Sequence, residues 1–352
     1  MKKCILVIAL VFSHLLFFCG SINAQSTALE QGSDTIISVV GYFCKNDTMT
    51  FRKQYLKQKI EGNDTTLINN HVEEFMIVVT DSTSKGYRME YIPISYEHGV
   101  EGDTITSRVM DEIWEATKDL HCIFATDEFG QLQHIENWRE IRDVMKKTIP
   151  QVLENYKPSN NSIVSRQRLE SMMLVNYSSE DKVKEAYDEL SMLFGVHGHS
   201  YYIGQKEGDY INNGYPQHII SKVGYTEQEE EGDMEGDYTI MVNSVTTMPA
   251  EDAVETIINS AALIFNDNMI DIFNKKKDEV YGVIKDALKD KKLTVTEDEY
   301  YDFFYNGWPK LCYKEKNMGV DSDKNVEMKL IEWTSRHWNI YEAEEEDDSH
   351  DL

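Results

Sequence analysis

The chain has few basic residues for its length. Its 352 residues include 35 lysines and arginines against 62 aspartates and glutamates, which gives a formal net charge of −27 at pH 7. Nucleic-acid binding needs a basic surface that displaces counterions from phosphates, so no nucleic-acid partner is expected. The same charge repels anionic lipid headgroups. Cations, basic partners and neutral ligands are the classes that this charge leaves open.

Cysteines and catalytic motifs are also scarce. Only Cys44, Cys122 and Cys312 follow the N-terminal segment that holds Cys4 and Cys19. Three cysteines form at most one bridge, so a disulfide scaffold is excluded. The sequence contains no G-x-S-x-G, P-loop, G-x-G-x-x-G or C-x-x-C motif. We therefore expect no cofactor, no assigned catalytic residue and a protein that is not an enzyme.

The chain has one long apolar run, and it lies at the N-terminus. Residues 4–18 follow two lysines and are interrupted only by Ser13 and His14. The run has 15 residues, fewer than the ~20 that span a bilayer as a helix. A charged start, a short apolar run and a small residue before the cut are typical of a secretory signal peptide. We expect residues 1–24 to be this signal, and the mature chain to be periplasmic or secreted with no transmembrane segment.

The position of the cut has two readings. Cleavage after Ala24 leaves Gln25 as the first mature residue. Cys19 suggests bacterial lipidation instead, but the residue before a lipidated cysteine is normally small, and here it is Phe18. We favour cleavage after Ala24.

The apolar pattern of the mature chain predicts strands first, then helices, then strands again. Period-two alternation predicts strands near 36–43, 48–60, 66–80 and 87–97, joined by turn-forming residues. Helical spacing follows at 106–119 and through most of 136–196 after a short hairpin. Strands are expected again at 200–205, 217–223 and 238–247, then a continuous or broken helix at 250–291, and last strands at 299–316 and 326–338.

This order predicts an α+β fold, because the strands and helices do not alternate as they do in a parallel doubly wound sheet. We expect a large, curved antiparallel β-sheet with helices packed on one face. Residues 25–340 are expected to form one domain, and the alternative is two sheet-plus-helix halves that meet near 160–200. Residues 341–352 are rich in acids and are expected to be a disordered tail.

Two groups of residues are weak candidates for a metal site. Asp321, Asp323, Asn325 and Glu332 have the oxygen spacing of a calcium loop, but Val326 replaces the glycine that such a loop requires. The second group is His197 and His199, which lack a third ligand at a recognisable spacing. We read the first group as a hairpin turn and the second as a loop after a helix, so no metal is expected.

Aromatic residues gather near the predicted strand at 299–316. They occur on both faces of the strand, which indicates either burial on both sides or a ligand groove under the 250–291 helix. Burial is the preferred reading, and the groove is the ligand-binding hypothesis. The candidate ligand-binding residues are Phe265, Tyr301, Phe303, Phe304, Tyr305 and Trp308.

A short Asp-Thr or Asp-Ser motif recurs near the mature N-terminus. It resembles the O-glycosylation signal of exported proteins of the Bacteroidota, and its presence at hairpin ends is the alternative explanation. The resemblance implies modification at Thr35, Thr48, Thr65, Ser82 and Thr104.

A second resemblance covers most of the mature chain. The block from Thr126 to Gly130 and on to Trp138 resembles uncharacterised secreted proteins of the Bacteroidota, a group with no activity to carry over. The order of elements also resembles periplasmic lipoprotein carriers, whose curved sheet wraps helices around an apolar cavity; this is an analogy of fold alone.

Three functions remain in competition. The first is a non-enzymatic exported protein that binds a hydrophobic small molecule or an envelope protein in a groove between sheet and helix. The second is a structural or surface-interaction protein of the envelope. The third is a hydrolase that uses a carboxylate pair hidden among the many acids. An apolar cavity favours the first, a solid core the second, and converging carboxyls with a strongly perturbed acid the third.

Overall fold

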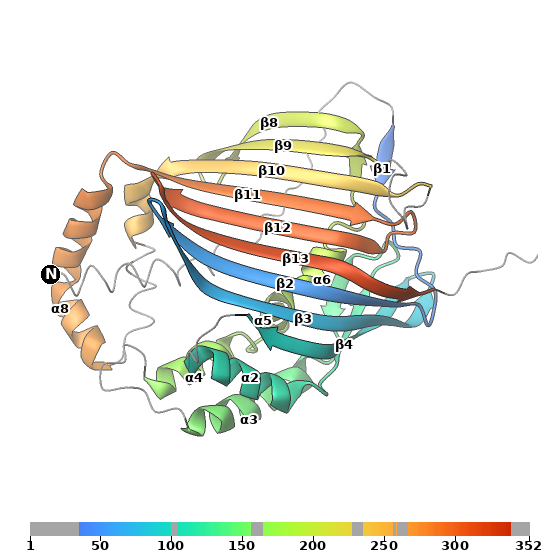
Figure 1. Cartoon of the computed structure of the whole chain (residues 1–352), viewed down its shortest axis with the longest axis horizontal. Helices are drawn as coiled ribbons and strands as arrows, with labels where there is room; N and C mark the ends of the chain where they lie inside the picture. The colour runs from blue at the N-terminus through green and yellow to red at the C-terminus, as the bar shows by residue number, and fades with distance from the viewer. Residues whose placement is uncertain are drawn as a thin grey trace, which may run out of the picture.

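One large antiparallel sheet dominates the structure, a computed structural model that describes residues 35–99, 105–155, 165–226, 235–255, 258 and 267–338. The sheet has eleven strands in the order β6-β5-β4-β3-β2-β13-β12-β11-β10-β9-β8 and does not close. It curves along its length (Figure 1). Its strands are β2 (Thr48–Glu61), β3 (Asp64–Thr83), β4 (Gly86–His98), β5 (Cys122–Thr126), β6 (Leu132–Ile135), β8 (Gly204–Asn212), β9 (Tyr215–Tyr225), β10 (Tyr238–Pro249), β11 (Lys292–Phe303), β12 (Pro309–Val320) and β13 (Asp323–His337).

The long hairpins follow from alternation and from turn residues. Along β2, buried side chains alternate with half-exposed ones from Thr48 onward, so one face of the strand is covered and the other is wet. Gly62 and Asp321 adopt positive φ angles of 61° and 56° where β2 meets β3 and β12 meets β13. Such angles suit glycine and are tolerated by aspartate, and they allow a two-residue turn.

The centre of the sheet is formed by strands from opposite ends of the chain. β2 pairs with β13 from Lys324↔Ile60 to His337↔Thr48, with an irregularity between Trp333 and Ser335. This pairing joins the N-terminal hairpins to the C-terminal ones in one continuous sheet. The fold class is therefore confirmed as α+β with a large antiparallel sheet.

Most helices lie between β4 and β8 in the chain. They are α2 (Ile105–Thr117), α3 (Trp138–Val152), α4 (Arg166–Val175), α5 (Glu180–Ala186) and α6 (Asp188–Phe194), with a 3₁₀ turn η2 (Leu153–Asn155) after α3. Figure 1 shows α2 to α5 beside the β4 end of the sheet, and α6 lies against the sheet itself. A two-stranded sheet of β1 (Ile36–Ser38) and β7 (Ser200–Tyr202) ties the first described residues to the segment after α6.

The sequence interpretation was wrong about one segment. The predicted strand 299–316 is two strands, because β11 ends at Phe303 and β12 begins at Pro309, with a turn between them. Gly307, with a φ of 82°, makes this turn possible, and a Cβ there would lie 2.2 Å from the Val40 carbonyl oxygen. For the predicted continuous or broken helix at 250–291, the structure has a short 3₁₀ helix, η3 (Ala250–Ala253), and α8 (Asp267–Leu288), which agrees with the broken form.

The main core lies at the end of the sheet that carries the β11–β12 turn. One face of the sheet, here called the inner face, packs there against α3, α5 and α6, and a single cluster runs from Ile37 to Ile331. Both halves of the chain contribute to it. The predicted domain boundaries stay a prediction, since residues 1–34 and 339–352, with the signal peptide and the acidic tail, lie outside the described residues.

We expect the aromatic core to dominate stability. Phe303 is fully buried, whereas Tyr305, two residues on, is 49% exposed. Phe303→Ala should lower the free energy of unfolding by about 3–5 kcal/mol, because it leaves a cavity in a packed cluster. Tyr305→Ala is the matched control and should change it by less than about 1 kcal/mol. Urea unfolding of the mature chain measures both, and equal losses would contradict the packing described.

Candidate functional site

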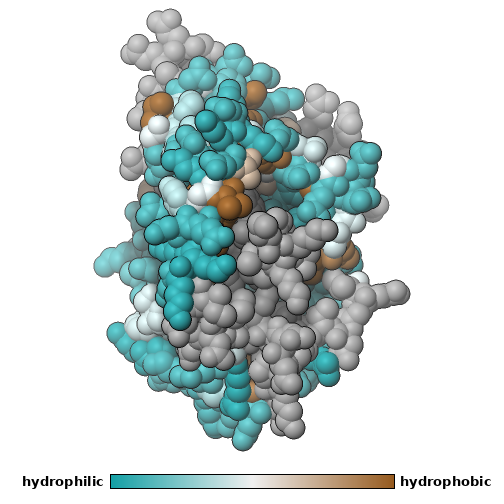
Figure 2. Space-filling view, turned by 90° about the vertical axis from the view of Figure 1, so that its left-hand side faces the viewer, coloured by the Kyte–Doolittle hydropathy of each residue, from teal (hydrophilic) through white to brown (hydrophobic). Residues whose placement is uncertain are grey.

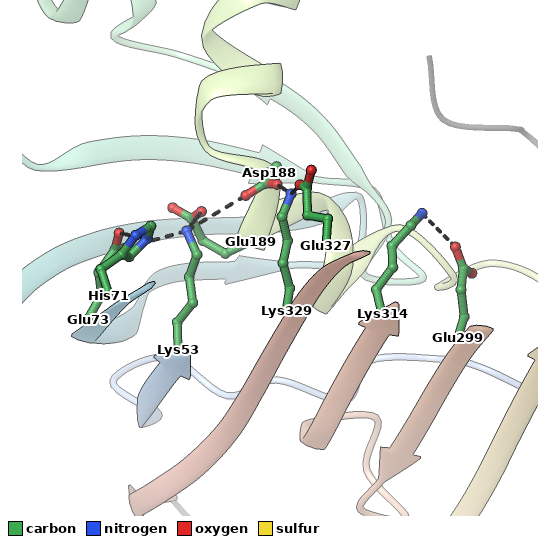
Figure 3. A network of polar contacts seen from close by, with 9 residues as sticks. All are labelled: Lys53, His71, Glu73, Asp188, Glu189, Glu299, Lys314, Glu327 and Lys329. Atoms are coloured by element: carbon green, nitrogen blue, oxygen red, sulfur yellow. Dashed lines mark hydrogen bonds and ion pairs between the residues drawn. The ribbon is translucent and has the colours of Figure 1, made fainter. Parts of the chain in front are cut away.

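Charged side chains form a band across the middle of the inner face. Alternation puts them there, because residues two apart on a strand share a face and paired residues on neighbouring strands share it too. We call this band the charged belt. On the sheet it consists of Lys53, His71, Glu73, Glu297, Glu299, Lys314, Lys316, Glu327 and Lys329, and α6 adds Asp188 and Glu189. Figure 3 draws all of these except Glu297 and Lys316.

Lys53 is the hub of the belt. Its side chain is 9% exposed, and its Nζ lies 3.0 Å from Glu189, 3.5 Å from Glu73 and 3.7 Å from Asp188. Figure 3 shows the two α6 acids turned down toward the sheet and Lys53 extended up to them. A buried ammonium needs such partners, because burial without them costs several kcal/mol. Lys53 therefore fixes the position of α6 on the sheet.

The three acids around Lys53 have divergent pKa values. Burial raises the pKa of Glu189 to about 7, against the pull of Lys53. Burial acts in the same direction on Glu73 and Asp188, but it is outweighed by Lys53 together with His71 at Glu73 and with Lys329 at Asp188, and the pKa of each is lowered to about 2. Burial alone would lower the Lys53 pKa, yet its acidic neighbours raise it well above the ordinary value. The hub therefore carries more acid than one lysine neutralises, and Glu189 takes up the proton.

The rest of the belt pairs lysines with acids across strands. Lys314 lies 2.6 Å from Glu299, and Lys316 lies 2.8 Å from Glu297, each pair directly opposed on β12 and β11. Lys329 contacts Asp188 and lies 3.4 Å from Glu327. The belt thus presents both signs of charge side by side.

The belt separates two apolar regions of the inner face. On one side is the aromatic core. On the other side a smaller cluster lies next to the β10–β11 end of the sheet and packs beneath η3. Figure 2 faces this end of the molecule, where the surface of the described residues is mostly hydrophilic with small hydrophobic patches. We call this cluster the apolar band; its residues are Met248, Ala250, Ala253, Leu288, Leu293, Val295, Met318 and Val320.

A row of rings adjoins the belt on β2, β3 and β4. The His71 ring stacks on Tyr55 at 4.8 Å and lies 5.4 Å from Tyr96, whose ring stacks on Trp114 of α2 at 6.2 Å. His71 also bonds Glu73 through Nε2 at 3.1 Å. The row connects α2 to the hub.

Four of the six predicted ligand-binding residues lie in the core. Tyr301, Phe303, Phe304 and Trp308 are 6% exposed or less. Phe303 stacks on Tyr238 at 5.3 Å, and Trp308 lies 4.5 Å from Phe43. Tyr305 is exposed, and Phe265 lies outside the described residues. The structure brings the four buried residues together as packing, and their role in ligand binding stays a prediction.

The first metal candidates are spread over a turn and a strand. Asp321 lies in the β12–β13 turn and pairs with Lys291 at 3.1 Å. Asp323 accepts a hydrogen bond from the Gly62 backbone at 3.0 Å, and Asn325 is buried in β13. Glu332 lies further along β13, 3.6 Å from Arg52. Three of these side chains contact the backbone or a side chain of a neighbouring segment, which agrees with the interpretation of Asp321–Asn325 as a hairpin turn.

The two candidate histidines also have other partners. His197 is fully buried, its Nε2 lies 2.9 Å from the Gly307 carbonyl oxygen, and burial lowers its pKa to about 4. His199 lies 3.3 Å from the Gln131 amide. Among the described residues, no group of three His, Cys, Asp or Glu side chains is placed to hold a metal ion.

The predicted modification sites lie mainly at strand ends. Thr35, Thr65 and Ser82 are exposed, Thr48 is half-buried at the start of β2, and Thr104 lies outside the described residues. The Ser82 hydroxyl donates to the Phe43 carbonyl at 3.0 Å. Their positions fit the hairpin-end explanation as well, and glycosylation stays a prediction.

Sequence reasoning missed the charged belt. The signal was present as charges at alternate positions, such as Glu297 and Glu299 or Lys314 and Lys316. In the sequence, such pairs indicate only the solvent-exposed face of a strand. The ion pairs between them become visible only when the pairing of the strands is known.

Comparisons with known proteins found matches among solved structures. No protein-family model matches the chain, and no curated protein matches it. A lipovitellin chain, solved in a study of lipid–protein interactions in lipovitellin, aligns with a TM-score of 0.36 and 8% identity. The alignment covers 85% of this chain and 26% of the lipovitellin chain, so this chain spans about a quarter of its length.

No helix in the described part of the chain is long and apolar enough to cross a membrane.

Loss of the hub lysine should destabilise the fold strongly. Lys53→Met leaves three acids beside an apolar side chain, and breaking a buried ion pair on one side costs about 3–5 kcal/mol. Lys118→Met is the control, because Lys118 pairs with Glu115 at the surface, and little change is expected. Chemical unfolding of both variants at pH 7 measures the difference. A Lys53→Met variant as stable as the wild type would contradict the role of the hub.

Glu189 should make stability fall with rising pH. Its folded pKa of about 7 exceeds the ordinary 4.5, so between these values the folded state holds a proton that the unfolded state has lost. Its contribution is therefore complete below pH 4.5 and is lost as the pH rises to about 7. His197 acts in the opposite direction over part of this range, because its pKa of about 4 lies below the ordinary 6.5. Thermal unfolding should therefore show that Glu189→Gln gains stability relative to the wild type as the pH rises from 4.5 to about 7. The exposed Glu128→Gln control should keep the wild-type slope; an unchanged slope in Glu189→Gln sinks the assignment.

Proposed function

We propose that this chain is an exported, non-enzymatic binding protein that holds an amphipathic small molecule on the inner face of its sheet. The observation that carries the proposal is the direct contact between the charged belt and the apolar band on neighbouring strands. Val295 lies two residues from Glu297 on the same face of β11, and Met318 lies two residues from Lys316 on β12. A molecule with one polar and one apolar part fits such a boundary.

The belt sets the chemistry of the polar part. Lys314 and Lys316 are 29% and 18% exposed at the side chain, and the acids opposite them are 26% and 14% exposed. Each charge is thus already matched and still reaches solvent. A zwitterionic or hydrogen-bonding group suits this surface better than a bare anion, because an anion would face the glutamates as well as the lysines.

The apolar band sets the place of the apolar part. Leu293 and Met318 are buried, whereas Val295 is half-buried in the same cluster. This location differs from the groove first expected around Phe303 and Phe304, since those rings are already packed against other aromatic side chains. The proposed ligand therefore lies along residues 293–299 of β11 and the strands beside it.

A hydrolase is the second candidate, and the hub favours it. An acid with a raised pKa beside two ionised carboxylates is an arrangement that acid–base catalysis uses. Against it, Lys53 lies within 3.7 Å of all three carboxylates, and Glu189 is 4% exposed at the side chain. A substrate would have to displace that lysine, so binding remains the preferred function.

Native mass spectrometry of the protein purified from its own host tests the proposal. We expect a bound small molecule, and Val295→Trp on the inner face should lower its occupancy by about tenfold, equivalent to 1.4 kcal/mol. Val245→Trp is the control, because Val245 lies on the adjacent β10 and pairs with Thr296 on the opposite face. Protein without any bound molecule, or equal loss in both variants, would overturn the binding site. Hydrolysis of a chromogenic glycoside that Glu189→Gln abolishes would favour the second candidate.

A further inference from the structure

The two edge strands of the large sheet differ in whether other residues cover their outward backbone groups. β6 forms one edge, and α5 covers its backbone with two side chains. Glu180 accepts a hydrogen bond from the Ile135 backbone at 3.2 Å, and Lys184 donates to the Gln133 carbonyl. These bonds use backbone groups that a bare edge strand would offer to another chain.

β8 forms the other edge, and within the described part of the chain it pairs only with β9. Figure 1 shows β8 as the outermost strand of the sheet. It has nine residues and contains no proline. In strand addition, an extended segment of another protein pairs with an edge strand and becomes a further strand of the sheet. The outward backbone groups of β8 suit this mode of binding better than those of β6.

The charges of β8 are divided between its two faces. The register Gly204↔Val223 puts even-numbered residues on the inner face and odd-numbered ones on the outer face. Glu207 and Asp209 are thus neighbours on the outer face, and the Asp209 side chain is 90% exposed. Lys206 is on the inner face with its Nζ 5.3 Å from the Tyr202 ring. On the outer face β8 thus carries two acids and no lysine or arginine, and Asp209 also lies 2.8 Å from His218 Nδ1 on β9.

Like charges oppose the pairing of β8 with a second copy of itself. A two-fold pair of edge strands is antiparallel and places residues of the same face opposite each other. A register centred on Gly208 opposes Glu207 with Asp209, and registers centred on Glu207 or Asp209 oppose each of these residues with its own copy. Each of these long registers is destabilised. Charge repulsion therefore disfavours pairing of β8 with a second copy of β8, while its outward backbone groups remain available to another strand.

We propose that the β8 edge binds an extended segment of a basic partner protein by strand addition. The segment carries lysine or arginine at two alternate positions, which lie opposite Glu207 and Asp209. Each such cross-strand pair joins opposite charges, and the backbone of β8 supplies the hydrogen bonds. The net charge of −27 steers a basic segment toward the chain. This surface is separate from the proposed ligand site on the inner face.

Synthetic peptides separate strand addition from simple charge attraction. The probes are capped nonapeptides of alternating threonine and lysine, with a glutamate version as the control, and fluorescence anisotropy with the mature chain measures binding. Two further lysine peptides carry N-methyl groups on the odd or on the even positions, which removes backbone donors and keeps the charge. In an added strand only one of these two sets faces β8, so we expect one methylated peptide to lose at least about tenfold in affinity and the other to bind. Loss in both, or in neither, would overturn the proposal.

Charge reversal places the site on β8. Glu207→Lys with Asp209→Lys should weaken the lysine peptide by about tenfold and create binding of the glutamate peptide. Asp278→Lys with Asp286→Lys makes the same change of net charge on exposed positions of α8 and should leave both peptides as in the wild type. Equal effects of the two double variants would show non-specific attraction. A wild-type dimer whose β8 amides gain protection from hydrogen exchange would show instead that a second copy occupies the edge, and would also refute the proposal.

Discussion

The pairing of β2 with β13 is the constraint on which the rest of the structure depends. It places the N-terminal hairpins and the C-terminal hairpins in one sheet, so that residues more than two hundred positions apart share an inner face. The charged belt depends on this pairing, because Lys53 lies on β2 whereas Glu327 and Lys329 lie on β13. Lys314 and Lys316 lie on β12, the next strand of the sheet. The same pairing lets one core cluster include side chains from both halves of the chain.

The inner face combines three kinds of surface. Near the β11–β12 turn it is aromatic and closed by α6, in the middle it is charged, and next to η3 it is aliphatic. Burial of the hub is tolerable because α6 brings two acids to one lysine, and that excess of acid gives Glu189 its raised pKa. A fully apolar inner face would pack equally well, but it would give a polar group on a ligand no preferred position.

The sequence allowed most strands and helices to be predicted, but it did not allow the charged belt to be predicted. Alternation along β2, β3 and β4 and the helical stripe of α3 are local signals, and the strands, the helix and the α+β class followed from them. The break at residues 304–308 does carry a local signal, because Asn306-Gly307 is a favoured turn dipeptide and Gly307 has a φ of 82°. It was missed because the aromatic residues on both sides of that dipeptide were read as one strand. The belt could not be predicted, because its ion pairs join α6 to β2 and β12 to β11, and no periodicity in one segment reports the register of another.

The order of strands in the sheet also determines when the sheet can be completed. A ribosome or a translocation channel delivers the N-terminus first, and β2 then has only β3 beside it. Its second neighbour, β13, ends at His337, so the central pair cannot form until nearly all of the chain has been delivered. Closing so long a loop is slow, and until it closes one side of β2 is an open edge. In a chain of this topology, the complete sheet therefore forms only after most of the residues have been delivered.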